Sequence, residues 1–127
     1  MIFRYTIIYV ADVPTTLQFY NAAFALETAH IHAGNDYGEL QTGATKLAFS
    51  SFALMAQIGK TVATEAAAKP AFELAFETDD VKHALERAVG AGAVLVQDVT
   101  RMPWGQTIAY VRTPEGTLVE LCTKVGD

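Results

Sequence analysis

Two passages of the sequence repeat the same pattern, and this repeat limits the folds open to the chain more than any other feature. When Asp12 is placed over Asp80, "TIIYVADVPTTLQFYNAAF" from Thr6 aligns with "LAFETDDVKHALERAVGAG" from Leu74. Each passage begins with a short apolar segment typical of a strand, continues with an aspartate, and ends in a segment with helical periodicity. The chain therefore contains two copies of one strand-helix unit.

The helical part of each passage has a defined start and an apolar stripe. Asp12 and Asp80 are natural N-caps, and Pro14 is tolerated in the first turn of a helix. "GAG" at residues 90–92 ends the second helix. Apolar residues recur at intervals of three and four, namely Val13, Leu17, Tyr20 and Phe24 in the first helix and Val81, Ala84, Leu85, Ala88 and Val89 in the second. We predict that both helices bury these stripes.

Three short segments of strand character follow each helix. "ETAHIH", "YGELQT" and "TKLAFS" follow the first, separated by the turn signals "AGND" and "GA". "AVLVQDV", "QTIAYVR" and "TLVELCT" follow the second, separated by "MPWG" and "TPEG". Both halves therefore read βαβββ, which predicts an α+β fold. We assign a single domain, 1–127, with internal modules 1–55 and 70–127. Residues 56–69 are the connector, and the alanine-rich stretch 52–69 fits a connection that is partly helical.

Length and composition narrow the chain to one ordered domain. Its 127 residues, 51% of them hydrophobic and 18% charged, suffice for one core and are too few for two independent domains. No apolar run approaches the roughly 20 residues of a membrane span, and the N-terminus lacks the layout of a cleavable signal. Cys122 is the only cysteine, which excludes an internal disulfide and favours a buried, inert thiol. We therefore expect a cytoplasmic protein.

A duplicated βαβββ chain of this length that closes with "PWGQTIAYVRTPEGTLVELCT" resembles the vicinal oxygen chelate superfamily. Glyoxalase I, bleomycin resistance proteins and extradiol dioxygenases belong to this superfamily. The most specific parts are the strand-Asp-Val-helix-"FY" opening at residues 7–20 and "TPEGTLVEL", which is similar to the family's Asp-Pro-x-Gly-Asn-x-x-Glu-Leu. The resemblance implies paired modules whose strands curl into a U-shaped cup, most often in a homodimer. It does not fix the function, because one fold hosts many activities.

Strand alternation, combined with this fold, assigns side chains to the two faces of each sheet. Glu73 and Glu120 are expected on the face away from the helices, on two strands that the fold places side by side. By the internal repeat, Tyr5 stands where Glu73 stands. Ala48, or Ser50 if the alignment slips by two, stands where Glu120 stands.

These four positions are the ones from which metal-binding members of the superfamily take their ligands. Here they read Tyr5, Ala48, Glu73 and Glu120. Tyrosine and alanine do not replace imidazole or carboxylate as ordinary ligands of zinc, nickel or iron, so we predict no resident metal. One alternative stays open, in which two carboxylates and water hold a divalent ion such as Mg²⁺ or Ca²⁺. Without a metal, the acids receive a cationic or hydrogen-bond-donating ligand, handle a proton, or lie at a solvated rim.

Two further features are candidates for ligand contact. His30 and His32 in "HIH" share one face of a strand at a spacing that can chelate a metal, although a solvated surface is the usual environment for such a pair. Trp104 precedes the seventh strand, where it can form the wall of a ligand cleft or pack in a core or interface.

The leading functional prediction is a metal-independent small-molecule binding protein of the glyoxalase and bleomycin-resistance type. Its ligand would be sequestered in a cup lined by Tyr5, Ala48, Glu73, Trp104 and Glu120. The alternative is a lyase or isomerase that acts on a small carbonyl compound, with Glu120 as base or metal ligand; catalytic residues are otherwise unassigned. A third reading is an interaction module that uses its sheet only to dimerise. The net charge of −5 and the scattered basic residues argue against a nucleic-acid partner.

Overall fold

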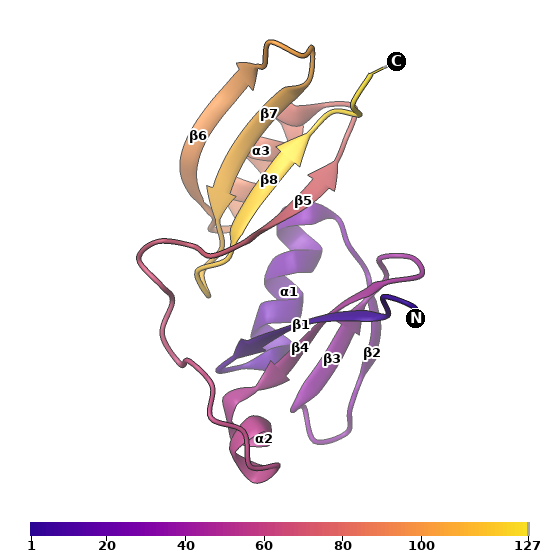
Figure 1. Ribbon diagram of the computed structural model, residues 1–127, viewed down its shortest axis with the longest axis vertical. Coiled ribbons are helices and arrows are strands. Elements are labelled where there is room, and N and C mark those ends of the chain that lie inside the picture. Colours follow the sequence, from indigo (N-terminus) through magenta and orange to yellow (C-terminus); the bar gives the residue numbers. More distant parts are fainter. Residues whose placement is uncertain (127) are drawn as a thin grey trace. The chain divides into compact units, whose positions relative to one another are not determined.

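The chain divides into two compact units, Met1–Glu65 and Ala66–Asp127, which we call the first and second unit. The computed structural model describes residues 1–126. Each unit contains one four-stranded mixed sheet with an α-helix packed against it (Figure 1). The boundary between the units falls within the connector, residues 56–69. The predicted α+β class and the duplicated βαβββ order are confirmed.

The first unit follows the order expected from the repeat. Its elements are β1 (Tyr5–Val10), α1 (Val13–Phe24), β2 (Thr28–Ile31), β3 (Tyr37–Leu40), β4 (Lys46–Ser51) and the short α2 (Phe52–Gln57). The strands lie in the order β1-β4-β3-β2, with β1 parallel to β4 and the other pairs antiparallel. β2 is therefore an edge strand.

The second unit repeats this topology strand for strand. Its elements are β5 (Glu73–Glu77), α3 (Val81–Ala91), β6 (Val94–Arg101), β7 (Thr107–Arg112) and β8 (Leu118–Cys122). The order is β5-β8-β7-β6, with β5 parallel to β8 and the other pairs antiparallel. Among the described residues, no helix is both long and apolar enough to cross a membrane.

The two predicted N-caps and the predicted end of the second helix are confirmed. Asp12 Oδ1 accepts a hydrogen bond from the Thr15 backbone N–H at 2.9 Å, and Asp80 Oδ1 accepts one from His83 N–H at 3.0 Å. α3 ends at Gly92, whose φ of 119° lies in the left-handed region that glycine adopts without strain. These caps fix where each helix starts relative to the strand that precedes it.

The apolar stripes of the helices fill the core of each unit. In α1 the buried residues are Val13, Leu17, Tyr20 and Ala23, and in α3 they are Val81, Leu85 and Ala88. A Cβ on Gly38 of β3 would lie 2.6 Å from Leu17 Cδ1, so glycine lets α1 pack this closely on the sheet without displacing the Leu17 side chain. The assignment of one residue to the buried stripe of α3 is wrong. Val89 is 43% exposed because it lies at the border of the buried face of α3.

Candidate functional site

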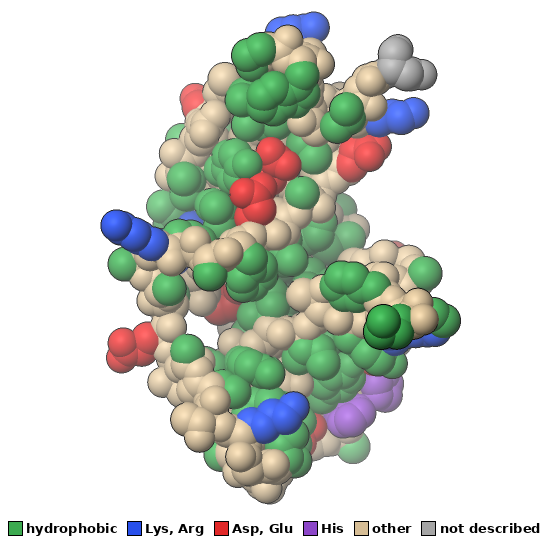
Figure 2. All heavy atoms as spheres, in the orientation of Figure 1, with side chains coloured by type: hydrophobic (Ala, Val, Ile, Leu, Met, Phe, Trp, Pro, Cys, Tyr) green, Lys and Arg blue, Asp and Glu red, His purple; other side chains and the backbone are tan. Residues whose placement is uncertain are grey.

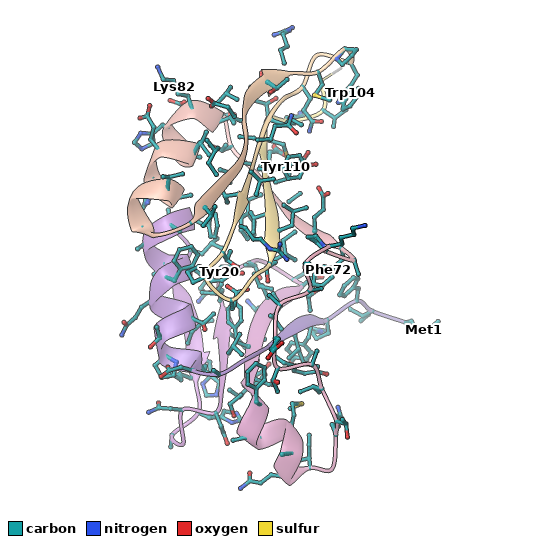
Figure 3. The ribbon with its side chains drawn as sticks, turned by 90° about the vertical axis from the view of Figure 1, so that its left-hand side faces the viewer. Met1, Tyr20, Phe72, Lys82, Trp104 and Tyr110 are labelled. Atoms are coloured by element: carbon teal, nitrogen blue, oxygen red, sulfur yellow. The ribbon has the colours of Figure 1, made fainter. Side chains whose placement is uncertain are left out.

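The face of the second sheet that points away from α3 brings the two predicted acids together. Ala75 lies opposite Glu120 in the parallel β5–β8 ladder, and alternation along β5 puts Glu73 on the same face. Tyr110 of β7 lies opposite Glu120 in the antiparallel β7–β8 ladder. Figure 3 shows Tyr110 on the side of the sheet away from α3. Three neighbouring strands therefore deliver two carboxylates and one phenol to one place.

The phenol of Tyr110 bridges the two carboxylates. Its oxygen lies 3.0 Å from Glu120 Oε2, 3.1 Å from Glu73 Oε2 and 3.4 Å from Glu73 Oε1. A phenol has a single proton to donate, whereas ionised carboxylates only accept. One of the two contacts therefore lacks a proton unless another donor supplies it. We call Glu73, Tyr110 and Glu120 the acid–phenol cluster.

The charge of the cluster is not neutralised by neighbouring side chains. Within residues 1–126, neither carboxylate is paired with a lysine or arginine. Arg112 lies two residues beyond Tyr110 on β7, but its guanidinium donates to the backbone carbonyls of Ala67, Ala68 and Gly116. Figure 2 shows acidic side chains (red) among hydrophobic ones (green) over β5, β7 and β8. A group of this kind favours a cationic or donor-rich partner.

Burial and the two carboxylates raise the pKa of the Tyr110 phenol well above its ordinary value. Burial contributes most, followed by the hydrogen bonds to Glu120 and Glu73 and by their charge. The phenol therefore stays protonated at any physiological pH, and its O–H remains available as a hydrogen-bond donor. The pKa of the Tyr37 phenol in the first unit is also raised, because the phenol is partly buried and donates a hydrogen bond to Glu39.

These pKa shifts predict the alkaline titration of the protein. The folded-state pKa of both phenols lies above the unfolded-state value of about 10. Their hydrogen bonds therefore stabilise the fold fully below that value, and the contribution is lost as the pH rises through the raised pKa. We expect the tyrosinate absorbance of native protein near pH 11 to lack at least Tyr37 and Tyr110, and Tyr110→Phe to leave that absorbance unchanged while it removes one of the late-titrating groups. A native titration in which all tyrosines ionise together would contradict the hydrogen-bonding scheme.

Cys122 lies on the same strand as Glu120 and is buried. Burial raises the pKa of its thiol, and the charges of Glu120 and Glu77 raise it further. Because the thiolate is the nucleophilic form, these groups keep the cysteine unreactive. The predicted burial of the thiol is confirmed, and its inertness stays a prediction.

The first unit carries different residues at the equivalent positions. Ile7 lies opposite Ala48 as Ala75 lies opposite Glu120, so the predicted equivalence of Ala48 with Glu120 is confirmed by the register. Tyr5 precedes Ile7 by two residues and is 48% exposed, but Ala48 has no exposed surface and offers nothing for a ligand to touch.

Sequence reasoning missed the residues on β3 and β7. Tyr37 donates its O–H to Glu39 Oε2 at 2.8 Å. Glu39 lies opposite Ala48, which is the position that Tyr110 takes opposite Glu120. Each unit thus places a tyrosine hydroxyl against a carboxylate on its helix-free face. The alternation in "YGEL" and "TIAYVR" is the sequence signal from which the face of these residues could be predicted.

Trp104 lies outside the acid–phenol cluster. It is 61% exposed in the turn between β6 and β7, and its Nε1–H donates to Gln106 Oε1 at 2.9 Å. Figure 3 shows it near the tip of this hairpin, beyond Tyr110 along the sheet. The turn that carries Trp104 leads into Thr107, whose backbone carbonyl accepts a hydrogen bond from Thr123 N–H. Thr123 is three residues from Glu120, or roughly 10 Å along the strand, so the turn lies at a distance from the cluster. A role for Trp104 as a ligand wall stays a prediction.

The donors in the second unit do not fit a transition-metal ion. Two carboxylates converge, but the third group beside them is a phenol, which is not among the ordinary ligands of zinc. Over residues 1–126, no group of three or more His, Cys, Asp or Glu side chains is arranged to hold a metal. Zinc and iron sites in proteins commonly take three or four such ligands.

Comparisons with known proteins agree with the fold. The sequence profile of the glyoxalase-like domain matches residues 3–126, and the chain belongs to this family. It is thus a member of the vicinal oxygen chelate superfamily, as the sequence pattern predicted. No curated protein matches the chain significantly.

Solved structures share this fold at low sequence identity. A glyoxalase-related enzyme from Fulvimarina pelagi has a TM-score of 0.81 and 21% identity, over 95% of this chain and 86% of that one. A glyoxalase/bleomycin resistance protein/dioxygenase family enzyme from Burkholderia phytofirmans PsJN has a TM-score of 0.78 and 20% identity, over 97% and 98%. TioX from Micromonospora sp. ML1 has a TM-score of 0.74 and 19% identity, over 97% and 98%. At these identities the likeness establishes the fold alone.

Proposed function

We propose that the chain is a small-molecule binding protein that holds a cationic or donor-rich organic ligand without a metal ion. The acid–phenol cluster is the polar part of the site. The observation that carries the proposal is the proton shortage at Tyr110, where one phenol O–H faces two carboxylates. An ammonium or amidinium group supplies the missing hydrogens and the opposite charge together.

The surroundings of the cluster suit an organic ligand with an apolar body. Phe72, which immediately precedes Glu73 at the start of β5, is 59% exposed. Apolar surface of this kind around a few polar groups is typical of small-molecule sites. Membership in the glyoxalase-like family supports a small organic molecule as the partner.

The proposal is tested by screening chelator-treated protein against two matched compound panels. One panel contains aromatic amines and amidines, and the other contains neutral compounds of the same shape. We expect members of the cationic panel to raise the melting temperature, since a ligand at 100 times its Kd stabilises the folded state by about 2.7 kcal/mol. Equal stabilisation by the neutral panel, or none by either panel, would contradict the proposal.

A second candidate function is proton transfer next to a carbonyl group. The raised pKa of Tyr110 keeps its O–H available as a donor to a carbonyl oxygen, while Glu120 lies 3.0 Å from that hydroxyl as a base. The reaction class would be a lyase or isomerase acting on a small carbonyl compound. Solvent-deuterium exchange at the α-carbon of simple carbonyl compounds, followed by NMR, distinguishes the two functions. Exchange that disappears in Glu120→Gln would support the enzymatic function. No exchange with any compound of the panel would support the binding function.

We also propose that the protein is a homodimer joined through β6. This edge strand is exposed along its whole length, and it includes Val94 at 65%, Leu95 at 47% and Val96 at 54% exposure. A long, unpaired edge strand with an apolar half is a surface that proteins usually cover. A second copy of the chain offers the same surface for self-complementary pairing.

The dimer predicts a specific effect of a charge on β6. Val96→Lys should shift the protein from dimer to monomer in sedimentation velocity at micromolar concentration, because the lysine would bury an unpaired charge in the interface. Val89→Lys is the matched control, since Val89 is a similarly exposed valine on α3, at 43%. A wild-type protein that sediments as a monomer, or a dimer that withstands Val96→Lys, would contradict this interface.

A further inference from the structure

We propose that His30 and His32 form a binding site for one divalent transition-metal ion at the β2 edge of the first unit. The site is separate from the acid–phenol cluster and does not depend on the proposed function. His30 lies opposite Glu39, and His32 N–H donates to Tyr37 O at 2.9 Å, so the β2–β3 ladder is regular across the pair. Alternation then places both imidazoles on one face.

That face is the one free of helix. Ile31 lies between the histidines and is paired with Gly38, whose position is in contact with Val13 and Leu17 of α1. The histidines therefore point to the opposite side, at the surface of the unit. Figure 2 shows histidine side chains (purple) exposed over the β2 edge of the first unit. An ion in solution reaches them directly.

The two rings are already spaced for a shared ion. Their centroids lie 5.1 Å apart, with an angle of 73° between the ring planes. Two imidazoles bound to one tetrahedral ion have centres about 5 Å apart, because each metal–nitrogen bond is about 2.1 Å and the ring centre lies about 1 Å further. No movement of the backbone is required to reach this separation.

Asp36 lies close to one of the two imidazoles. His32 Nδ1 lies 3.6 Å from Asp36 Oδ1, which leaves Nε2 as the nitrogen available to an ion. Histidines that bind metals usually direct their other ring nitrogen to a carboxylate or carbonyl. The backbone holds Asp36 in place, because Ser51 N–H donates to Asp36 O at 2.9 Å and Asn35 N–H donates to His32 O at 2.9 Å.

The protein supplies two direct ligands, and water completes the coordination. Glu39 lies across from His30, but its carboxylate accepts the hydrogen bond of Tyr37. No third ligand converges among residues 1–126. Imidazole pairs of this type suit Zn²⁺, Cu²⁺ and Ni²⁺ rather than Mg²⁺ or Ca²⁺. The competing explanation is that the rings only pack against each other and against Tyr37, whose centroid lies 5.0 Å from that of His32.

The test is a calorimetric titration of untagged, chelator-treated protein with Zn²⁺ and Ni²⁺ in a non-coordinating buffer. We expect one ion per chain, at least tenfold weaker binding in His30→Asn and in His32→Asn, and roughly tenfold weaker binding in Asp36→Asn. His83→Asn is the matched control, because His83 is an exposed histidine on α3, and it should leave binding unchanged. Glu120→Gln should also leave it unchanged, which separates this site from the acid–phenol cluster.

A measurement on the wild-type protein makes the test independent of any variant. In ¹H–¹⁵N spectra that detect the imidazole nitrogens, Zn²⁺ should shift the ring signals of His30 and His32 and leave His83 in place. No binding by wild type, equal losses in His83→Asn, or a loss in Glu120→Gln with none in the two histidine variants would overturn the proposal.

Discussion

Glu120→Gln is expected to weaken binding of a cationic ligand by at least tenfold while the protein stays folded. The change keeps the shape of the side chain and its contact distance to Tyr110, but it removes the charge that the ligand would meet. Hydrogen bonds to charged groups contribute about 1.5–3 kcal/mol, which corresponds to a tenfold or greater change in Kd. Glu73→Gln should behave similarly, because its carboxylate contacts the same phenol oxygen. Isothermal titration of a ligand found in the panel screen measures both effects.

Glu77→Gln is the matched control for this experiment. Glu77 lies at the end of β5, opposite Cys122, and its substitution changes the net charge by the same amount. Its carboxylate is outside the acid–phenol cluster, so we expect a change in Kd of less than about twofold. An equal loss in Glu77→Gln would show that the ligand responds to the general negative charge of the face. An unchanged Kd in Glu120→Gln would show that the acid–phenol cluster is not part of the binding site.

Tyr20→Ala is expected to produce the largest loss of stability among single substitutions in the first unit, about 4 kcal/mol in the free energy of unfolding. Tyr20 has no exposed surface, and its ring centroid lies 4.8 Å from that of Phe49 and 5.3 Å from that of Phe24. Figure 3 shows it between α1 and the sheet. Alanine would leave a cavity at the centre of this aromatic group. Because small domains are stable by about 5–15 kcal/mol, the variant should be close to unfolding.

Tyr9→Ala controls for the loss of a tyrosine as such. Tyr9 lies on β1 of the same unit and is 37% exposed, so its removal should cost about 1 kcal/mol. Urea denaturation followed by circular dichroism gives both values. Equal losses in the two variants would contradict the position of Tyr20 in the core.

The fold was predictable because its signals are local and occur twice. Asp12 and Asp80 cap the two helices as the alignment of the repeat required, and the strand order repeats between the units. The register also confirms the equivalence of Ala48 with Glu120, which followed from the internal repeat taken together with the fold that the chain resembles. Val89 was misassigned because helical periodicity alone does not define how wide the buried face of α3 is.

The site was predicted only in part, because its central member is set by pairing between strands. The placement of Glu73 and Glu120 followed from alternation within their own strands. Tyr110 enters the site because the β7–β8 hairpin sets it opposite Glu120, and this depends on the register that the turn at residues 113–116 imposes. The direction of the Trp104 ring was not predictable for a similar reason, since the conformation of the β6–β7 turn determines which way an exposed ring points.

The central claim is that the carboxylates of the acid–phenol cluster act on an organic ligand directly. One calorimetric experiment tests it: titration of the ligand into protein whose metal content is shown by mass spectrometry to be far below one ion per chain, and again after Zn²⁺, Ni²⁺ or Mg²⁺ is added back. We predict the same Kd before and after the addition, and weaker binding in Glu120→Gln in both cases. Binding that appears only after a metal is added, and that Glu120→Gln then abolishes, would contradict the claim.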